Sequence, residues 1–104
     1  MGIPVKYKEI LPDLNDSEIV NNVIKFISLI DDSIPIADVI EEPDGEVAFE
    51  WYSENDNKNV LSISVGKTEN LSFAGMFEGG RIMGTEPISS FDVDLIKLIL
   101  KKLK

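Results

Sequence analysis

The sequence contains no cysteine and no histidine among its 104 residues. Without cysteine, the chain has no disulfide framework and no thiolate metal site. Without histidine, it lacks the side chain that most often serves as a general base and as a metal ligand near neutral pH. A metal site in this chain must therefore use oxygen ligands, which suit calcium or magnesium.

Positive charge is also scarce: 10 Lys and Arg stand against 19 Asp and Glu, and the formal net charge is −9. Residues 1–58 hold 14 acidic and 4 basic side chains, whereas residues 59–104 hold 5 and 6. Such a chain is repelled by nucleic acid and by anionic membranes. We therefore expect no nucleic-acid partner and no membrane partner. The acidic surface serves either solubility alone or the binding of a basic protein partner.

Long apolar runs are missing as well, because Lys25 and Lys97 interrupt the longest ones. The first residues lack the apolar stretch of a signal peptide, so a cytoplasmic location is the default expectation. The length predicts a single domain over residues 1–104. Pro4 and Pro12 predict an irregular arm over residues 1–14.

Apolar periodicity predicts two amphipathic helices. Over residues 15–30 the stripe consists of Ile19, Val23, Ile27 and Ile30, widened by Val20 and Ile24. Asn15 and Glu18 have the spacing of a capping box at the start of this helix. Ser89 or Ser90 can cap the second helix, whose apolar face is Phe91, Leu95, Ile96, Ile99, Leu100 and Leu103.

Between the helices, period-two alternation predicts strands over residues 36–40, 46–52, 61–65, 71–77 and 82–85. One face carries the large apolar residues Val47, Phe49, Trp51, Leu61, Ile63, Val65, Leu71, Phe73, Phe77 and Ile82. The other face carries the small residues Ala48, Ser62, Ser64, Ser72, Ala74 and Thr85. The predicted fold is α+β, a five-stranded antiparallel meander with an N-terminal and a C-terminal helix packed on one face.

Two turns carry explicit turn chemistry. Residues 42–45 have the Pro, Asp and Gly order of a tight turn. Residues 79–80 are a Gly-Gly pair that suits a two-residue hairpin loop. A loop at 79–80 predicts that Phe77 faces Ile82, Met76 faces Met83 and Gly75 faces Gly84.

Several short motifs resemble catalytic or binding motifs, but each is incomplete. Residues 66–68, Gly-Lys-Thr, end like a phosphate loop without its first glycine or its following helix, so a hairpin turn is the simpler interpretation. Residues 64–67 have the Ser/Lys spacing of an acyl-enzyme motif without its partner motifs. Residues 40–51 and 55–66 imitate calcium loops but fail at ligand positions. We therefore predict no catalytic, cofactor or metal site.

Exposed apolar residues on the small-residue face are the best candidates for function. Three aromatic residues could stack on a ligand: Tyr7, Trp51 and Tyr52. Of these, Trp51 falls on the same sheet face as the predicted core residues. The predicted partner surface consists of Tyr52, Val60, Met76 and Met83, with Glu46 and Glu50 on the same face. The competing interpretation is a scatter of ordinary surface residues.

Residues 45–51, GEVAFEW, and residues 80–87, GRIMGTEP, form a pattern of a Gly turn, a Glu-Trp strand and a Gly-Thr-X-Pro strand end. The pattern resembles one found in small uncharacterised bacterial α+β proteins. The resemblance covers roughly residues 36–103 and implies the same helix, meander and helix order. It lends no activity and no functional residue.

By elimination, we expect a non-enzymatic cytoplasmic module that binds another protein, of the regulator, antitoxin or immunity type. It would act as a monomer or a weak homodimer. The alternative is a small-ligand-binding or carboxylate-based enzymatic domain with a cleft between helix and sheet. A pocket of at least ~300 Å³ with converging polar groups would favour that alternative.

Overall fold

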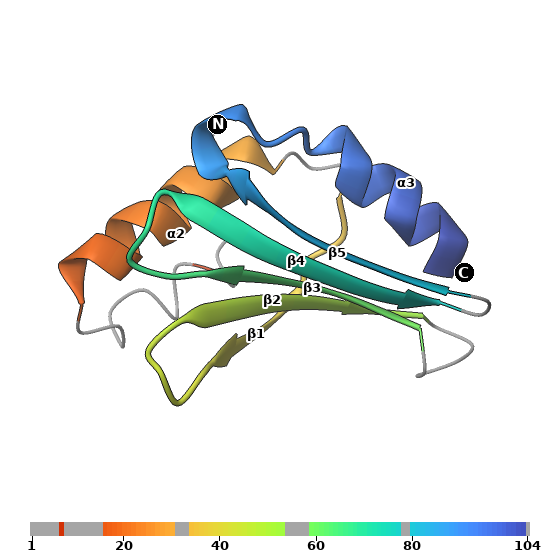
Figure 1. Ribbon diagram of the computed structural model, residues 1–104, viewed down its shortest axis with the longest axis horizontal. Helices are drawn as coiled ribbons and strands as arrows, with labels where there is room; N and C mark the ends of the chain where they lie inside the picture. The colour runs from red at the N-terminus through yellow and green to blue at the C-terminus, as the bar shows by residue number, and fades with distance from the viewer. Residues whose placement is uncertain (1–6, 8–15, 31–33, 54–58, 78–79, 104) are drawn as a thin grey trace.

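The computed structural model describes residues 7, 16–30, 34–53, 59–77 and 80–103. Its elements are, in order, α2 (Ser17–Leu29), β1 (Asp38–Glu41), β2 (Val47–Tyr52), β3 (Val60–Val65), β4 (Asn70–Phe77), β5 (Gly80–Pro87), the short 3-10 helix η2 (Ile88–Ser90) and α3 (Asp94–Leu103). The strands form one antiparallel sheet in the order β1-β2-β3-β4-β5 (Figure 1). The predicted α+β class and five-stranded meander are confirmed.

Helix α2 begins one residue later than a capping box at Asn15 requires. Asp16 is its N-cap, and its Oδ1 accepts from the backbone N–H of Glu18 at 2.9 Å and of Ile19 at 3.4 Å. The prediction of Asn15 as the cap was wrong because the carboxylate at the next position takes those donors. Position 15 itself lies outside the described residues.

The buried stripe of α2 is also rotated slightly from the predicted one. Ile19, Val23, Ile27 and Ile30 are buried as expected. The stripe is widened by Asn22 and Phe26, which are buried, rather than by Val20 and Ile24, which are only partly buried. The helix ends where Ile30 turns extended, so its predicted end is confirmed.

Strand β1 begins later than the predicted strand over residues 36–40. Backbone groups just before it have side-chain partners: Trp51 Nε1 donates to Pro35 O and Ala37 N donates to the Tyr7 hydroxyl, both at 2.8 Å. These contacts replace ladder bonds and delay pairing until Asp38. The turn into β2 closes as expected, with Gly45 at φ 91° and its N–H donating to Glu42 O at 2.9 Å.

The β4–β5 hairpin corrects the predicted register. Phe77 faces Gly80, Gly75 faces Ile82 and Phe73 faces Gly84, so the loop lies at residues 78–79, outside the described residues. The pairing of Gly75 with Gly84 was therefore wrong. The error is a shift of two residues along β5, and a shift of two leaves each side chain on its predicted face.

Packing explains why Gly84 faces an aromatic residue. A Cβ at position 84 would lie 2.7 Å from Phe73 Cζ, so the ring covers the space that a side chain would need. A Cβ at Gly75 would lie 3.2 Å from Ile82 Cγ1. Large side chains thus lie across each glycine. At Gly84, on the edge strand β5, this is the aromatic cover known to compensate an edge glycine.

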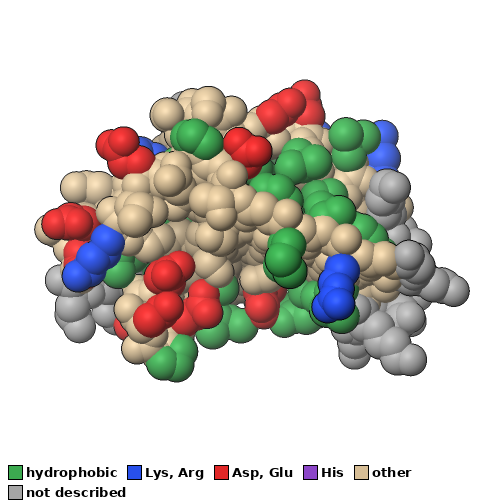
Figure 2. Space-filling view, viewed as in Figure 1, with side chains coloured by type: hydrophobic (Ala, Val, Ile, Leu, Met, Phe, Trp, Pro, Cys, Tyr) green, Lys and Arg blue, Asp and Glu red, His purple; other side chains and the backbone are tan. Residues whose placement is uncertain are grey.

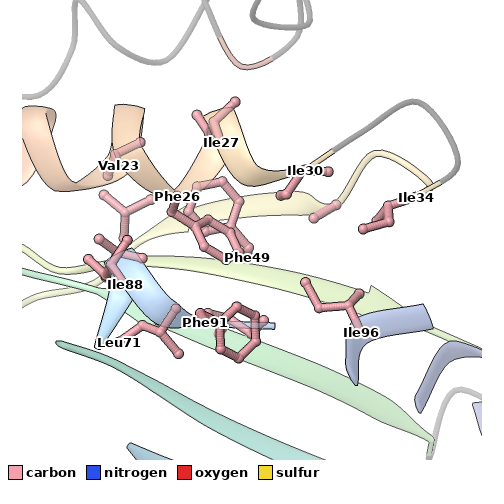
Figure 3. Packing of buried hydrophobic residues seen from close by; sticks show 14 of the residues in the cluster. Val23, Phe26, Ile27, Ile30, Ile34, Phe49, Leu71, Ile88, Phe91 and Ile96 are labelled. Carbon is pink, nitrogen blue, oxygen red and sulfur yellow. The ribbon is translucent and has the colours of Figure 1, made fainter. Parts of the chain in front are cut away.

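The core is one cluster of buried residues from the helices and the sheet. Figure 3 shows side chains of α2, β2, β4, the η2 segment and α3 converging in one cluster. The Phe26 ring lies 4.9 Å from the Phe49 ring and 6.4 Å from the Phe91 ring. Of the ten predicted core residues of the sheet, seven are buried, and Phe73, Phe77 and Ile82 are partly buried against the cluster.

The start of α3 differs from the predicted serine cap. Ser89 and Ser90 belong to η2, and Phe91 is extended after it. The Asp92 carboxylate instead accepts from the backbone N–H of Asp94 at 2.9 Å. The extended residue lets the buried Phe91 reach the core before the helix begins. The serine cap was therefore wrong, although Ile96 and Ile99 are buried as predicted.

Candidate functional site

The sheet face opposite the core carries the predicted partner surface. We call it the outer face, defined by the residues that the strand pairing places on one side: Asp38, Ile40, Ala48, Glu50, Tyr52, Val60, Ser62, Ser64, Asn70, Ser72, Ala74, Met76, Arg81, Met83, Thr85 and Pro87. Apart from the buried Ala48, these residues are exposed or half-buried. The side chains in the middle of this face are small and project little from the sheet. The larger apolar residues Ile40, Tyr52, Met76 and Met83 are exposed on it.

Three of the four apolar candidates lie directly opposite one another. Tyr52 faces Val60 across β2 and β3, and Val60 faces Met76 across β3 and β4. Met83 lies on β5 opposite Ala74, one diagonal step from Met76 rather than directly across from it. We call Tyr52, Val60, Met76 and Met83 the apolar patch.

The two carboxylate candidates lie at different distances from the apolar patch. Glu50 is adjacent to it, because the Tyr52 hydroxyl donates to Glu50 Oε1. This hydrogen bond, followed by burial, raises the pKa of Tyr52. Glu46 is six residues from Tyr52 along the chain, about 20 Å at strand spacing. The structure therefore brings Glu50 to the patch and leaves Glu46 at the other end of the face.

Glu46 belongs to a group of carboxylates at the β1–β2 turn. Burial raises the pKa of Glu46, and the charges of Asp44 and Glu42 raise it further. Glu42 is held over the outer face, where its Oε1 accepts from Ser64 Oγ at 2.9 Å. We call Asp38, Glu42, Asp44, Glu46 and Glu50 the acidic margin. Figure 2 shows carboxylates along the upper, left and lower parts of the view, with a largely uncharged centre and apolar side chains toward the right.

The other two aromatic candidates are not available to a ligand. Tyr7 is buried, its ring lies 5.6 Å from that of Phe49 with their planes at 77°, and burial raises its pKa. Trp51 is buried on the core face and its indole N–H donates to Pro35 O. Tyr52 is thus the exposed aromatic residue of the three.

Two groups that sequence reasoning missed tie α2 to the β3–β4 turn. The buried Asn22 donates from Nδ2 to Gly66 O and to Thr68 O, each at 2.8 Å. Lys67 Nζ lies 3.1 Å from Asp16 Oδ2. The sequence did offer a signal for Asn22, because it is a polar residue on the side of the helix that is buried. The turn at 66–68 leads into β4, so the prediction of a hairpin turn there is confirmed.

A crevice beside the contact between α2 and the β3–β4 turn is lined by Asn22, Lys25, Glu69, Ile88 and Ser89. Its volume of about 60 Å³ is far below that of a typical small-molecule pocket, roughly 300–1,000 Å³. Within the described part of the chain, no group of three or more carboxylates is placed to hold a metal ion. The calcium-like segment 55–66 lies partly outside that described part.

Comparison with protein-family models, curated proteins and solved structures finds no match to this chain. Among the described helices, none has the length and apolar character needed to cross a membrane. A function for this chain must therefore be inferred from the geometry of the outer face.

Proposed function

We propose that this chain is a cytoplasmic, non-enzymatic protein-binding module of the regulator, antitoxin or immunity type, and that the apolar patch is its contact surface. The exposure of the patch carries the proposal: Tyr52, Met76 and Met83 are 45, 53 and 73 % exposed on one sheet face. Exposed apolar side chains that gather on one surface are typical of sites for a protein partner. Methionine side chains also adapt readily to the shape of such a partner.

The arrangement of the helices supports this use of the outer face. We propose that α2 and α3 both cover the core face and leave the outer face to the partner. Buried residues of both helices, such as Phe26 and Ile96, belong to one cluster with Phe49 and Leu71 of the sheet. In Figure 1 the two helices are drawn on the same side of the strands.

The chemistry of the partner follows from the charge beside the patch. Glu50 adjoins Tyr52, and the rest of the acidic margin extends along β1 and the β1–β2 turn. On the β1–β2 side of the patch, a partner that presents an apolar residue flanked by Lys or Arg would complement both parts, whereas Arg81 lies opposite Met76 on the β5 side. Opposite charges would speed the encounter, and apolar contact would hold the complex together.

The test compares two exposed apolar residues on different surfaces. A partner captured from cell extract with the wild-type chain is purified, and its dissociation constant is measured for the wild type, Met76→Lys and Leu98→Lys. Leu98 is 58 % exposed on α3 and is the matched control. We expect Met76→Lys to weaken binding at least ~10-fold and Leu98→Lys to leave it unchanged. Equal affinities for the two variants would overturn the proposal.

A further inference from the structure

The sheet has two edges of very different character. Strand β1 is four residues long and carries Asp38 and Glu41, and short charged strands are a common protection against edge pairing. Strand β5 is eight residues long, has one charge near each end, Arg81 and Glu86, and has six exposed residues. Among the described residues, no strand pairs with its outer side (Figure 1).

The hydrogen-bond pattern identifies which groups of β5 point outward. Ile88 N donates to Glu69 O at 2.8 Å, and this pair continues the β4–β5 register one step past Pro87. Bonded pairs alternate along an antiparallel ladder. Gly80, Ile82, Gly84 and Glu86 are therefore bonded to β4, while Arg81, Met83 and Thr85 direct their N–H and C=O groups to the free edge. Pro87 has no N–H to offer.

We propose that this edge pairs with β5 of a second copy of the chain, antiparallel, about a two-fold axis at Met83. In this register Met83 faces Met83 of the second copy and Arg81 faces Thr85 of the second copy. The N–H and C=O groups of Arg81, Met83 and Thr85 then all find partners. A register centred on Gly84 is poorer, because it places Pro87, which lacks a donor, opposite Arg81.

The distribution of charge permits a second copy at this edge. The acidic residues concentrate in β1, β2 and the turn between them, whereas residues 59–104 hold 5 acidic and 6 basic side chains. Pairing through β5 places β2 and its copy seven strand spacings apart, about 34 Å at ~4.8 Å per spacing. This separation is about four Debye lengths at physiological ionic strength, where one Debye length is about 8 Å. The two acidic margins therefore do not oppose the contact.

The dimer would also join the outer faces of the two copies. A two-fold axis perpendicular to the sheet keeps the outer face of each copy on the same side. Met83, at the axis, would connect the two apolar patches into one surface. This second interface depends on the β5 backbone, so the dimer and the proposed partner binding can be tested separately.

The first test measures the mass of the protein in solution and the effect of removing one backbone N–H on the dimer dissociation constant. Sedimentation of the wild type over a concentration series should show a reversible shift from 11.6 kDa to twice that mass. Thr85→Pro removes an outward N–H, whereas Thr85→Val keeps it. We expect Thr85→Pro to raise the dimer dissociation constant at least ~10-fold and Thr85→Val to leave it near the wild-type value. A wild type that stays monomeric throughout, or equal constants for the two variants, would refute the proposal.

The second test needs no disruptive substitution. Because the chain has no native cysteine, Met83→Cys and Leu98→Cys each place a single thiol on an exposed site. A short bismaleimide should crosslink Met83→Cys into dimers and leave Leu98→Cys monomeric. Crosslinking of Leu98→Cys alone, or of both to the same extent, would rule out a two-fold axis at Met83. Because the acidic margins are far apart, the dimer constant should also change little with salt, unlike binding of a basic partner.

Discussion

At the scale of single residues, Gly84 shows how one missing side chain sets the fit between two strands. Valine at this position must displace the Phe73 ring, because its Cβ would lie 2.7 Å from Phe73 Cζ. We expect Gly84→Val to lower the free energy of unfolding by ~1–3 kcal/mol, despite the better strand propensity of valine. The control is Gly80→Val, since no atom lies within 4 Å of a Cβ there. Equal urea midpoints for the two variants would contradict the register.

Glu46 gives a pH-dependent prediction at the same scale. Its folded-state pKa is raised, so the folded protein binds more protons than the unfolded chain between the two pKa values. Stability is therefore lost as pH rises through that window. We expect Glu46→Gln to raise the thermal midpoint at pH 7 and to match the wild type below the ordinary Glu range, about pH 4. Glu41→Gln, an exposed carboxylate on β1, is the control. A lower midpoint for Glu46→Gln at pH 7 would show the carboxylate to be stabilising.

At the scale of elements, Asn22 holds α2 against the β3–β4 turn through two hydrogen bonds. Removing its amide leaves the carbonyl of the buried Gly66 without this donor. We expect Asn22→Ala to cost about 1–3 kcal/mol of unfolding free energy, the usual penalty for an unsatisfied buried group. Asn21→Ala makes the same chemical change at an exposed position of α2 and should be nearly neutral. Similar urea midpoints for both variants would mean that the two hydrogen bonds of Asn22 contribute nothing to stability.

The elements also show what the sequence could and could not predict. Alternation in β2 to β5 predicted which residues face the core, because the period of two survives an error of two residues in register. The register itself depends on the contact of Phe73 with Gly84, which no local turn motif encodes. The carbonyl of Gly66 that Asn22 binds lies 44 residues away in the chain, and the contact of Tyr7 with Phe49 also joins residues far apart in the sequence. The apolar patch was predictable for the same reason as the core, whereas the position of Glu46 relative to it was not.

At the scale of the whole molecule, charge decides which partners can approach. The net charge is −9, and Lys67 and Lys97 each lie within 4 Å of a carboxylate oxygen. Of the other described cations, Lys25 lies on α2, Arg81 on β5, and Lys101 and Lys102 on α3. In the view of Figure 2 the basic side chains lie apart from one another. Binding to nucleic acid requires a cationic surface that releases several counterions at once.

This distribution predicts that the chain does not bind nucleic acid tightly at moderate salt. A mobility-shift titration with duplex DNA, single-stranded DNA and RNA should show no complex at micromolar protein. The informative control substitutes lysine for two residues of the acidic margin, Glu46 and Glu50. If charge alone excludes nucleic acid, this variant should gain weak binding that disappears as salt rises. Specific sub-micromolar binding by the wild type would overturn both this prediction and the proposed use of the outer face. The strand pairing places Arg81 on that face, and a single cation releases too few counterions for tight binding.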